Sequence, residues 1–243
     1  MPIQEVHHKW FSPNLSLDTE MLTVGESGVP VVLFPTTKGS YMQNRDFGLV
    51  GVVAPLIEGG LIQVICVDSV DAYSFYNYDI DPASRIRNHM WFDRMVLEEV
   101  VLPAIERSGE SRVIVGGCSF GGYHAANFAF RYPHLVSNMI SMGGAFDIRQ
   151  FVFGHYDDNV YFNNPVDFVK GLSDHNIMTH MRRMGIILGT GHDDICRADN
   201  YQMSEILNSK GIAYWLDDRP GVGHDWPWWR DMFAHYMGTI FSG

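Results

Sequence analysis

The sequence predicts an α/β protein with a mostly parallel central sheet, helices on both faces and an antiparallel hairpin at the N-terminus. Short runs of apolar, often β-branched residues recur along the chain, and such runs are typical of strands buried on both faces of a sheet. Longer segments with apolar residues at helical spacing lie between most of these runs. Alternating strands and helices favour a parallel sheet between two helical layers.

The expected elements follow one another in a regular order. Residues 3–10 and 20–24 alternate between polar and apolar side chains, and they are predicted to pair as the hairpin. Continuous apolar runs predict six further strands, at residues 29–35, 61–69, 111–119, 138–146, 184–191 and 212–220. Helical spacing predicts helices at residues 85–107, 122–132, 200–209 and 226–241, and Pro103 is expected to kink or end the first of them.

The length of 243 residues fits one domain, which we expect to span residues 1–243. Residues 151–183 are long for a single connection, and we expect them to form a small helical excursion over the active site at the carboxyl edge of the sheet. Ligand sites of such sheets lie at this edge.

Composition excludes several classes of partner. The net charge of −11 disfavours binding to nucleic acid or to anionic membranes. No apolar segment reaches the ~18 residues of a membrane span, and no secretion signal is recognisable, so the default expectation is a cytoplasmic protein. The three cysteines and the histidines show no metal-ligand spacing, so we expect neither a metal nor a cofactor.

The letters GCSFG at residues 117–121 carry the first sign of chemistry. They satisfy G-x-S-x-G between a predicted buried strand and a predicted helix, which is the context of a nucleophile elbow. Ser119 would then have a strained backbone and an exposed hydroxyl. A glycine-rich turn without chemistry is the alternative.

A serine nucleophile needs a base, and the base needs a carboxylate that orients it. In this architecture the acid and the histidine are expected after later strands, in the order Ser, Asp, His. The strand at residues 184–191 is followed by Asp193 and Asp194, and the last strand is followed by His224. We favour Asp194 as the acid because it is the fourth residue of the turn, and Asp193 stays as the alternative.

Stabilising an oxyanion takes two donors, normally backbone amides. The amide of Phe120, directly after the serine, is the first candidate. The second should come from the loop after the strand at residues 29–35, where we expect the amide of Thr37 to serve.

Three segments resemble one group of the α/β-hydrolase superfamily, which includes esterase D (S-formylglutathione hydrolase), feruloyl esterases and the antigen 85 mycolyltransferases. They are GCSFGGYHAANFAFRYPHLV at 117–136, FDRMVLEEVVLPAIE at 92–106 and GHDWPWWRDMF at 223–233. The resemblance implies Ser119, Asp194 and His224 as a catalytic triad. The chain departs from the group in the loop after the strand at 29–35, where Pro35-Thr36 replaces the usual His-Gly.

Together these observations predict a serine esterase that hydrolyses a small-molecule carboxylic ester of short to medium acyl chain. An acyltransferase with the same triad, a peptidase and a non-catalytic binding protein of the same fold are the alternatives. Exposed aromatic residues also allow a homo-oligomer.

Overall fold

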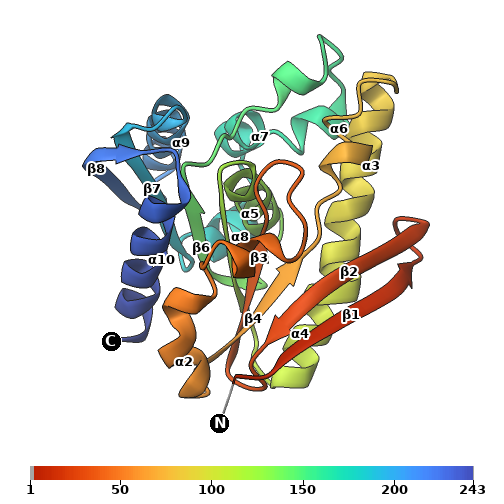
Figure 1. Cartoon of the computed structure of the whole chain (residues 1–243). Coiled ribbons are helices and arrows are strands. Elements are labelled where there is room, and N and C mark those ends of the chain that lie inside the picture. The colour runs from red at the N-terminus through yellow and green to blue at the C-terminus, as the bar shows by residue number, and fades with distance from the viewer. Residues whose placement is uncertain (1–2, 243) are drawn as a thin grey trace.

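A single eight-stranded sheet organises the chain in the computed structural model, which describes residues 3–242 (Figure 1). The strand order is β1-β2-β4-β3-β5-β6-β7-β8. β1 and β2 form an antiparallel hairpin, β2 joins β4 antiparallel, and all other neighbours are parallel. The strands are β1 (Glu5–Ser12), β2 (Leu17–Val24), β3 (Val29–Phe34), β4 (Ile62–Val67), β5 (Val113–Cys118), β6 (Val136–Met142), β7 (Gly185–Asp193) and β8 (Trp215–Gly223).

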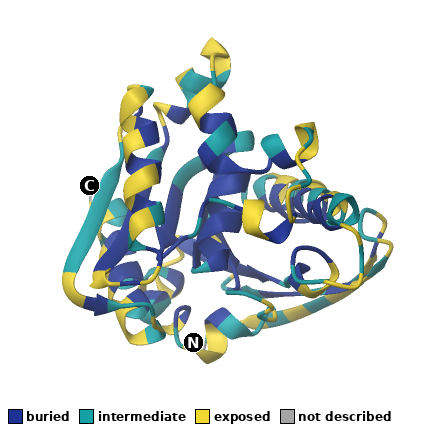
Figure 2. Ribbon diagram, turned by 90° about the horizontal axis from the view of Figure 1, so that it is seen from above, coloured by how far each residue is buried: buried dark blue, intermediate teal, exposed yellow. Residues whose placement is uncertain are grey.

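Helices cover both faces of this sheet. One face carries α2 (Ala54–Glu58) and α10 (Trp226–Phe241). The other carries α3 (Pro82–Met95), α4 (Leu102–Ser108), α5 (Phe120–Arg131), α7 (Pro165–Gly171) and α9 (Arg197–Ser209). Figure 2 shows the buried residues gathered between the sheet and these helices. The predicted fold class and the N-terminal hairpin are therefore confirmed.

The sheet has one hydrophobic core on each face, because successive side chains of a strand point to opposite faces. Val32 and Phe34 of β3 pack into the layer beneath α3 and α5. Val31 and Leu33 of the same strand pack into the layer beneath α2 and α10. A strand that is buried on both faces must be apolar throughout, and this requirement is why the runs were recognisable in the sequence.

The long helix differs from the prediction at Pro103. The chain neither kinks sharply nor stops there, because a π-helical segment (Val96–Val101) joins α3 to α4. Proline lacks an N–H donor, and its ring would clash with the carbonyl of residue 99 in a regular helix. The wider π turn absorbs this conflict, so the helical segment continues from residue 82 to residue 108.

The connection between β6 and β7 is largely helical. It contains a short turn (Arg149–Phe151), α6 (Asp158–Tyr161), α7 and α8 (His175–Met181). Phe151, Val152 and Val160 pack in one buried cluster with Phe120, the residue after Ser119. β6 ends at Met142, earlier than predicted, because Gly143 turns the chain with a left-handed φ of 60°. Within residues 3–242, no helix is long and apolar enough to cross a membrane.

Candidate active site

Ser119 lies alone between the end of β5 and the start of α5. Its φ of 55° and ψ of −123° are unfavourable for a residue with a side chain. The flanking glycines are required by close approach: a Cβ on Gly117 would lie 2.4 Å from the backbone of Gly121. A Cβ on Gly121 would lie 2.5 Å from the carbonyl oxygen of Phe34. The turn is thus a tightly packed elbow that presents the serine side chain.

A chain of hydrogen bonds joins Ser119 to an aspartate through a histidine. His224 Nε2 lies 2.8 Å from Ser119 Oγ, and His224 Nδ1 lies 2.8 Å from Asp194 Oδ1. The Asp194 side chain is 1% exposed and that of His224 is 16% exposed. The acid is therefore sealed from water, while the imidazole remains accessible beside the serine.

The structure also separates the two adjacent aspartates. Asp194 Oδ1 accepts a second hydrogen bond from the amide of Cys196 at 2.8 Å, which holds the carboxylate in place. Asp193 is the last residue of β7, is exposed, and pairs in register with Gly223 of β8. Of the two, only Asp194 contacts the imidazole in the part of the chain that the structure describes.

The two predicted oxyanion amides are both left free. Among residues 3–242, no acceptor takes a hydrogen bond from the backbone N–H of Phe120 or of Thr37. The neighbours of Thr37 differ: the Thr36 amide donates to Gln43 Oε1 at 2.8 Å, and the Lys38 amide donates to Asp71 Oδ2 at 2.9 Å. A free amide between two bound ones is available to a ligand atom.

Aromatic side chains surround this centre. The ring of Trp229 contacts His224 edge-on at a centroid distance of 4.9 Å. On the other side, Tyr76 and Phe151 approach each other at 4.9 Å, and both contact Phe120. Trp229 itself belongs mostly to the core, with 4% exposure.

Asp194, Cys196 and His224 are also the one group of side chains in residues 3–242 with ligand atoms close enough for a metal ion, all within 4.8 Å. Their chemistry does not fit a resident metal. The carboxylate and the imidazole are hydrogen-bonded to each other. Burial raises the pKa of the Cys196 thiol to about 12, so it stays protonated at neutral pH and is a poor ligand.

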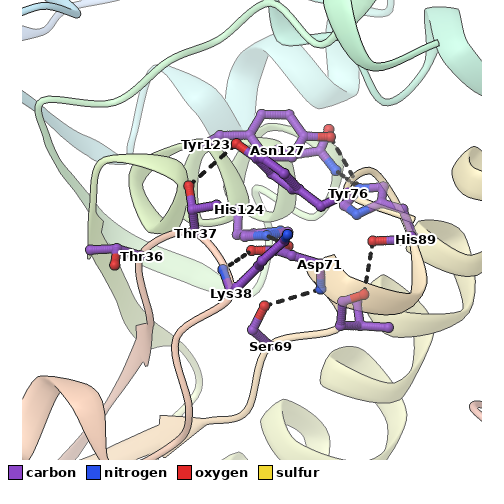
Figure 3. A network of polar contacts seen from close by, with 12 residues as sticks. Thr36, Thr37, Lys38, Ser69, Asp71, Tyr76, His89, Tyr123, His124 and Asn127 are labelled. Atoms are coloured by element: carbon purple, nitrogen blue, oxygen red, sulfur yellow. Dashed lines mark hydrogen bonds and ion pairs between the residues drawn. The ribbon is translucent and has the colours of Figure 1, made fainter. Parts of the chain in front are cut away.

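One polar cluster beneath the site was missed by sequence reasoning. Asp71, His89, Tyr123, His124 and Asn127 are buried, and hydrogen bonds connect them in two groups (Figure 3). Burial lowers the pKa of His89 well below its ordinary value. A run of polar residues on the otherwise apolar helix that follows Ser119 is the signal that could have revealed them.

Comparison with known proteins agrees with this architecture. A family model described as the alpha/beta hydrolase fold matches residues 72–183, a span that includes the elbow. The chain has the α/β-hydrolase fold. No curated protein matches it in sequence.

Solved structures of α/β-hydrolases superpose over nearly the whole chain. A ferulic acid esterase is 16% identical with a TM-score of 0.77, covering 98% of this chain and 97% of its own. The fluorophosphonate-binding serine hydrolase F of Staphylococcus aureus is 13% identical with a TM-score of 0.77, covering 100% of both chains. The S-formylglutathione hydrolase of Agrobacterium tumefaciens is 12% identical with a TM-score of 0.75, covering 98% and 94%. The resemblance indicated by the sequence is confirmed at the level of fold.

Proposed function

We propose that this α/β-hydrolase is a serine hydrolase that cleaves small carboxylic esters through Ser119, His224 and Asp194. The observation that carries the proposal is the hydrogen-bond chain Ser119 Oγ–His224 Nε2 and His224 Nδ1–Asp194 Oδ1, with both distances at 2.8 Å. The names of the structures with the same fold, a ferulic acid esterase and an S-formylglutathione hydrolase among them, support an ester or thioester as substrate.

The first half of the reaction forms an acyl-enzyme. Ser119 Oγ attacks the carbonyl carbon while its proton passes to His224 Nε2, and the carbonyl π electrons move onto oxygen. Asp194 accepts a hydrogen bond from the Nδ1–H of His224 and stabilises the imidazolium without taking the proton. The amides of Phe120 and Thr37 bind the oxyanion, and the N-terminus of α5 adds a positive potential at the same point.

Collapse of the tetrahedral intermediate breaks the bond to the alcohol, which leaves with the proton from His224 Nε2. Water then enters, gives a proton to the same nitrogen and attacks the acyl carbon. The second intermediate expels Ser119 Oγ, which recovers the proton, and the carboxylic acid is released. This cycle needs neither a metal nor an organic cofactor.

The segment beside the site supports a short to medium acyl group. The segment after β6 contributes four residues to the buried cluster that contains Phe120, namely Ile148, Phe151, Val152 and Val160. Phe151, Val152 and Val160 are buried at 8%, 1% and 0% exposure. Moving these residues away from Phe120 would expose a packed core to water. We therefore expect the site not to widen for long acyl chains.

A serine-reactive fluorophosphonate tests the nucleophile. Wild type should be labelled at Ser119, and a Ser119→Ala variant that circular dichroism shows to be folded should not. Labelling of the folded variant to the same extent would overturn the assignment. A folded wild type that resists labelling would favour the non-catalytic alternative.

A series of p-nitrophenyl esters tests the substrate class. Activity should be greatest for short acyl chains and should fall beyond about eight carbons, because we expect the site not to widen. Activity that keeps rising with chain length would contradict the proposal. The same reaction with an added alcohol acceptor distinguishes hydrolysis from acyl transfer by its product, and a matched amide tests for peptidase activity.

A further inference from the structure

We propose that Asp71 is a positioning residue that ties the loop carrying the Thr37 amide to the helix carrying the Phe120 amide. The inference rests on the proposed function, since it concerns how the two oxyanion donors are held at a fixed separation. Asp71 begins the short turn after β4 (Asp71–Tyr73), and its side chain is 0% exposed. A carboxylate buried this deeply needs partners, and its partners define its role.

The two carboxylate oxygens of Asp71 point to two different segments (Figure 3). Oδ2 accepts a hydrogen bond from the Lys38 amide at 2.9 Å, directly after Thr37. Oδ1 lies 3.0 Å from His124 Nε2. His124 is on α5, four residues after Phe120, so it lies one helical turn from the first oxyanion amide. One side chain thus bridges the segments that follow β3, β4 and β5.

The loop after β3 contains a backbone conformation that surrounding contacts must hold in place. Lys38 has a left-handed φ of 56°, which is unfavourable for a residue with a Cβ and persists where surrounding contacts hold it. The Thr36 amide is held by Gln43. With Thr36 and Lys38 both anchored, the peptide between them is fixed, and the Thr37 N–H keeps one direction.

The other end of the link is rigid as well. The ring of His124 stacks on Phe34 at 5.8 Å and meets Phe120 edge-on at 4.9 Å. His124 Nδ1 is buried and has no partner among residues 3–242, which favours the tautomer whose Nε2–H donates to Asp71. The backbone amide of Asp71 donates to Ser69 Oγ at 3.1 Å, so the backbone that carries this side chain is fixed as well.

Kinetics of Asp71→Asn and Asp71→Ala test the role. A displaced oxyanion donor weakens binding of the transition state more than binding of the substrate. We expect kcat for a p-nitrophenyl ester to fall about 10- to 100-fold, with KM changed less than about threefold. The affinity for a trifluoromethyl ketone, which forms a tetrahedral oxyanion on Ser119, should fall by a similar factor.

Asp93→Asn is the matched control. Asp93 is a second buried carboxylate, at 5% exposure. Its Oδ2 accepts a hydrogen bond from Tyr132 and pairs with Arg131 at 3.1 Å, and within residues 3–242 it makes no hydrogen bond to the oxyanion loop. If loss of a buried charge alone were responsible, both variants would lose kcat equally. That result, or a loss at Asp71 confined to KM, would overturn the proposal.

Hydrogen exchange of the Lys38 amide tests the link without relying on activity. In wild type this amide should exchange slowly, and in Asp71→Ala at least about tenfold faster, because its acceptor is gone. An unchanged rate in a folded variant would refute the link. Failure of wild type to react with a fluorophosphonate would instead refute the proposed function, so the two failures are distinguishable.

Discussion

Replacing the two neighbouring aspartates one at a time gives the sharpest test of the hydrogen-bond geometry. Asp194→Asn and Asp193→Asn change the same atoms in adjacent residues. Asp194 is buried and contacts His224, whereas Asp193 is exposed at the end of β7. The structure therefore predicts a large loss of kcat for the first variant and almost none for the second.

The magnitude follows from what Asp194 Oδ1 does. It receives two hydrogen bonds, one from His224 Nδ1 and one from the Cys196 amide. If the new amide oxygen stays at that point, only the charge is lost. The charge-assisted bond is worth about 1.5–3 kcal/mol, which is the most that this change can remove, and at about 1.4 kcal/mol per factor of ten the loss is about 10-fold to 10²-fold.

If the new amide nitrogen takes that place instead, it faces the Nδ1–H of His224 and the N–H of Cys196, which are both donors. The imidazole must then move its proton from Nδ1 to Nε2. Nε2 then carries the proton and cannot accept one from Ser119, so the loss approaches about 10⁴-fold. Because the Asp194 side chain is 1% exposed, no water replaces the missing charge. We therefore expect a loss between about 10-fold and 10⁴-fold.

The assay is kcat for p-nitrophenyl acetate at a fixed pH, normalised to the folded fraction from circular dichroism. Asp193→Asn should stay within about threefold of wild type, because a surface charge change away from the reacting atoms alters little. An equal loss in both variants would refute this assignment of the acid. So would an Asp194→Asn variant that keeps more than about a tenth of the activity.

Three further predictions concern stability and are measured by urea unfolding. Ser119→Gly should raise the free energy of unfolding by about 1 kcal/mol relative to Ser119→Ala, because glycine relieves the left-handed backbone; equal stabilities would contradict the strain argument. Gly121→Ala should lower it by about 3 kcal/mol, since the new Cβ would lie 2.5 Å from the Phe34 carbonyl. Gly51→Ala, which meets open space, should stay within about 0.5 kcal/mol, and similar shifts in the two would rule out the packing explanation. Burial lowers the pKa of His89, so below about pH 6.5 the unfolded chain binds a proton that the folded chain does not. Stability should fall with decreasing pH in that range, by up to about 1.4 kcal/mol per unit from this residue, and His89→Gln should reduce the slope; an unchanged slope would assign the effect to other groups.

Much of the fold was predictable because its determinants are local. A strand buried on both faces must be apolar throughout, as β3 and β5 are, and this pattern is visible in six residues. The π-helical segment before Pro103 was not predictable. Whether a proline ends a helix or is absorbed by a wider turn depends on what the helix packs against.

The site was predictable in part for a related reason. Ser119 stands out because the glycines on either side of it are demanded by backbone contacts within the elbow. The network around Asp71 left a weaker mark, the polar residues Tyr123, His124 and Asn127 on the otherwise apolar helix after Ser119. Its members Asp71, His89 and His124 come from three separate segments, and each alone is indistinguishable from an ordinary polar residue.

By itself, the sequence determined the layered α/β architecture, the position of the elbow and the order of serine, acid and histidine. These properties depend on periodicity and on residue type at the ends of strands. Only the tertiary structure decided that Asp194, and not Asp193, contacts His224, because the direction of a side chain depends on the path of another strand 30 residues away. It alone also revealed the Asp71 link, since three parallel strands must lie side by side before the segments that follow them can meet.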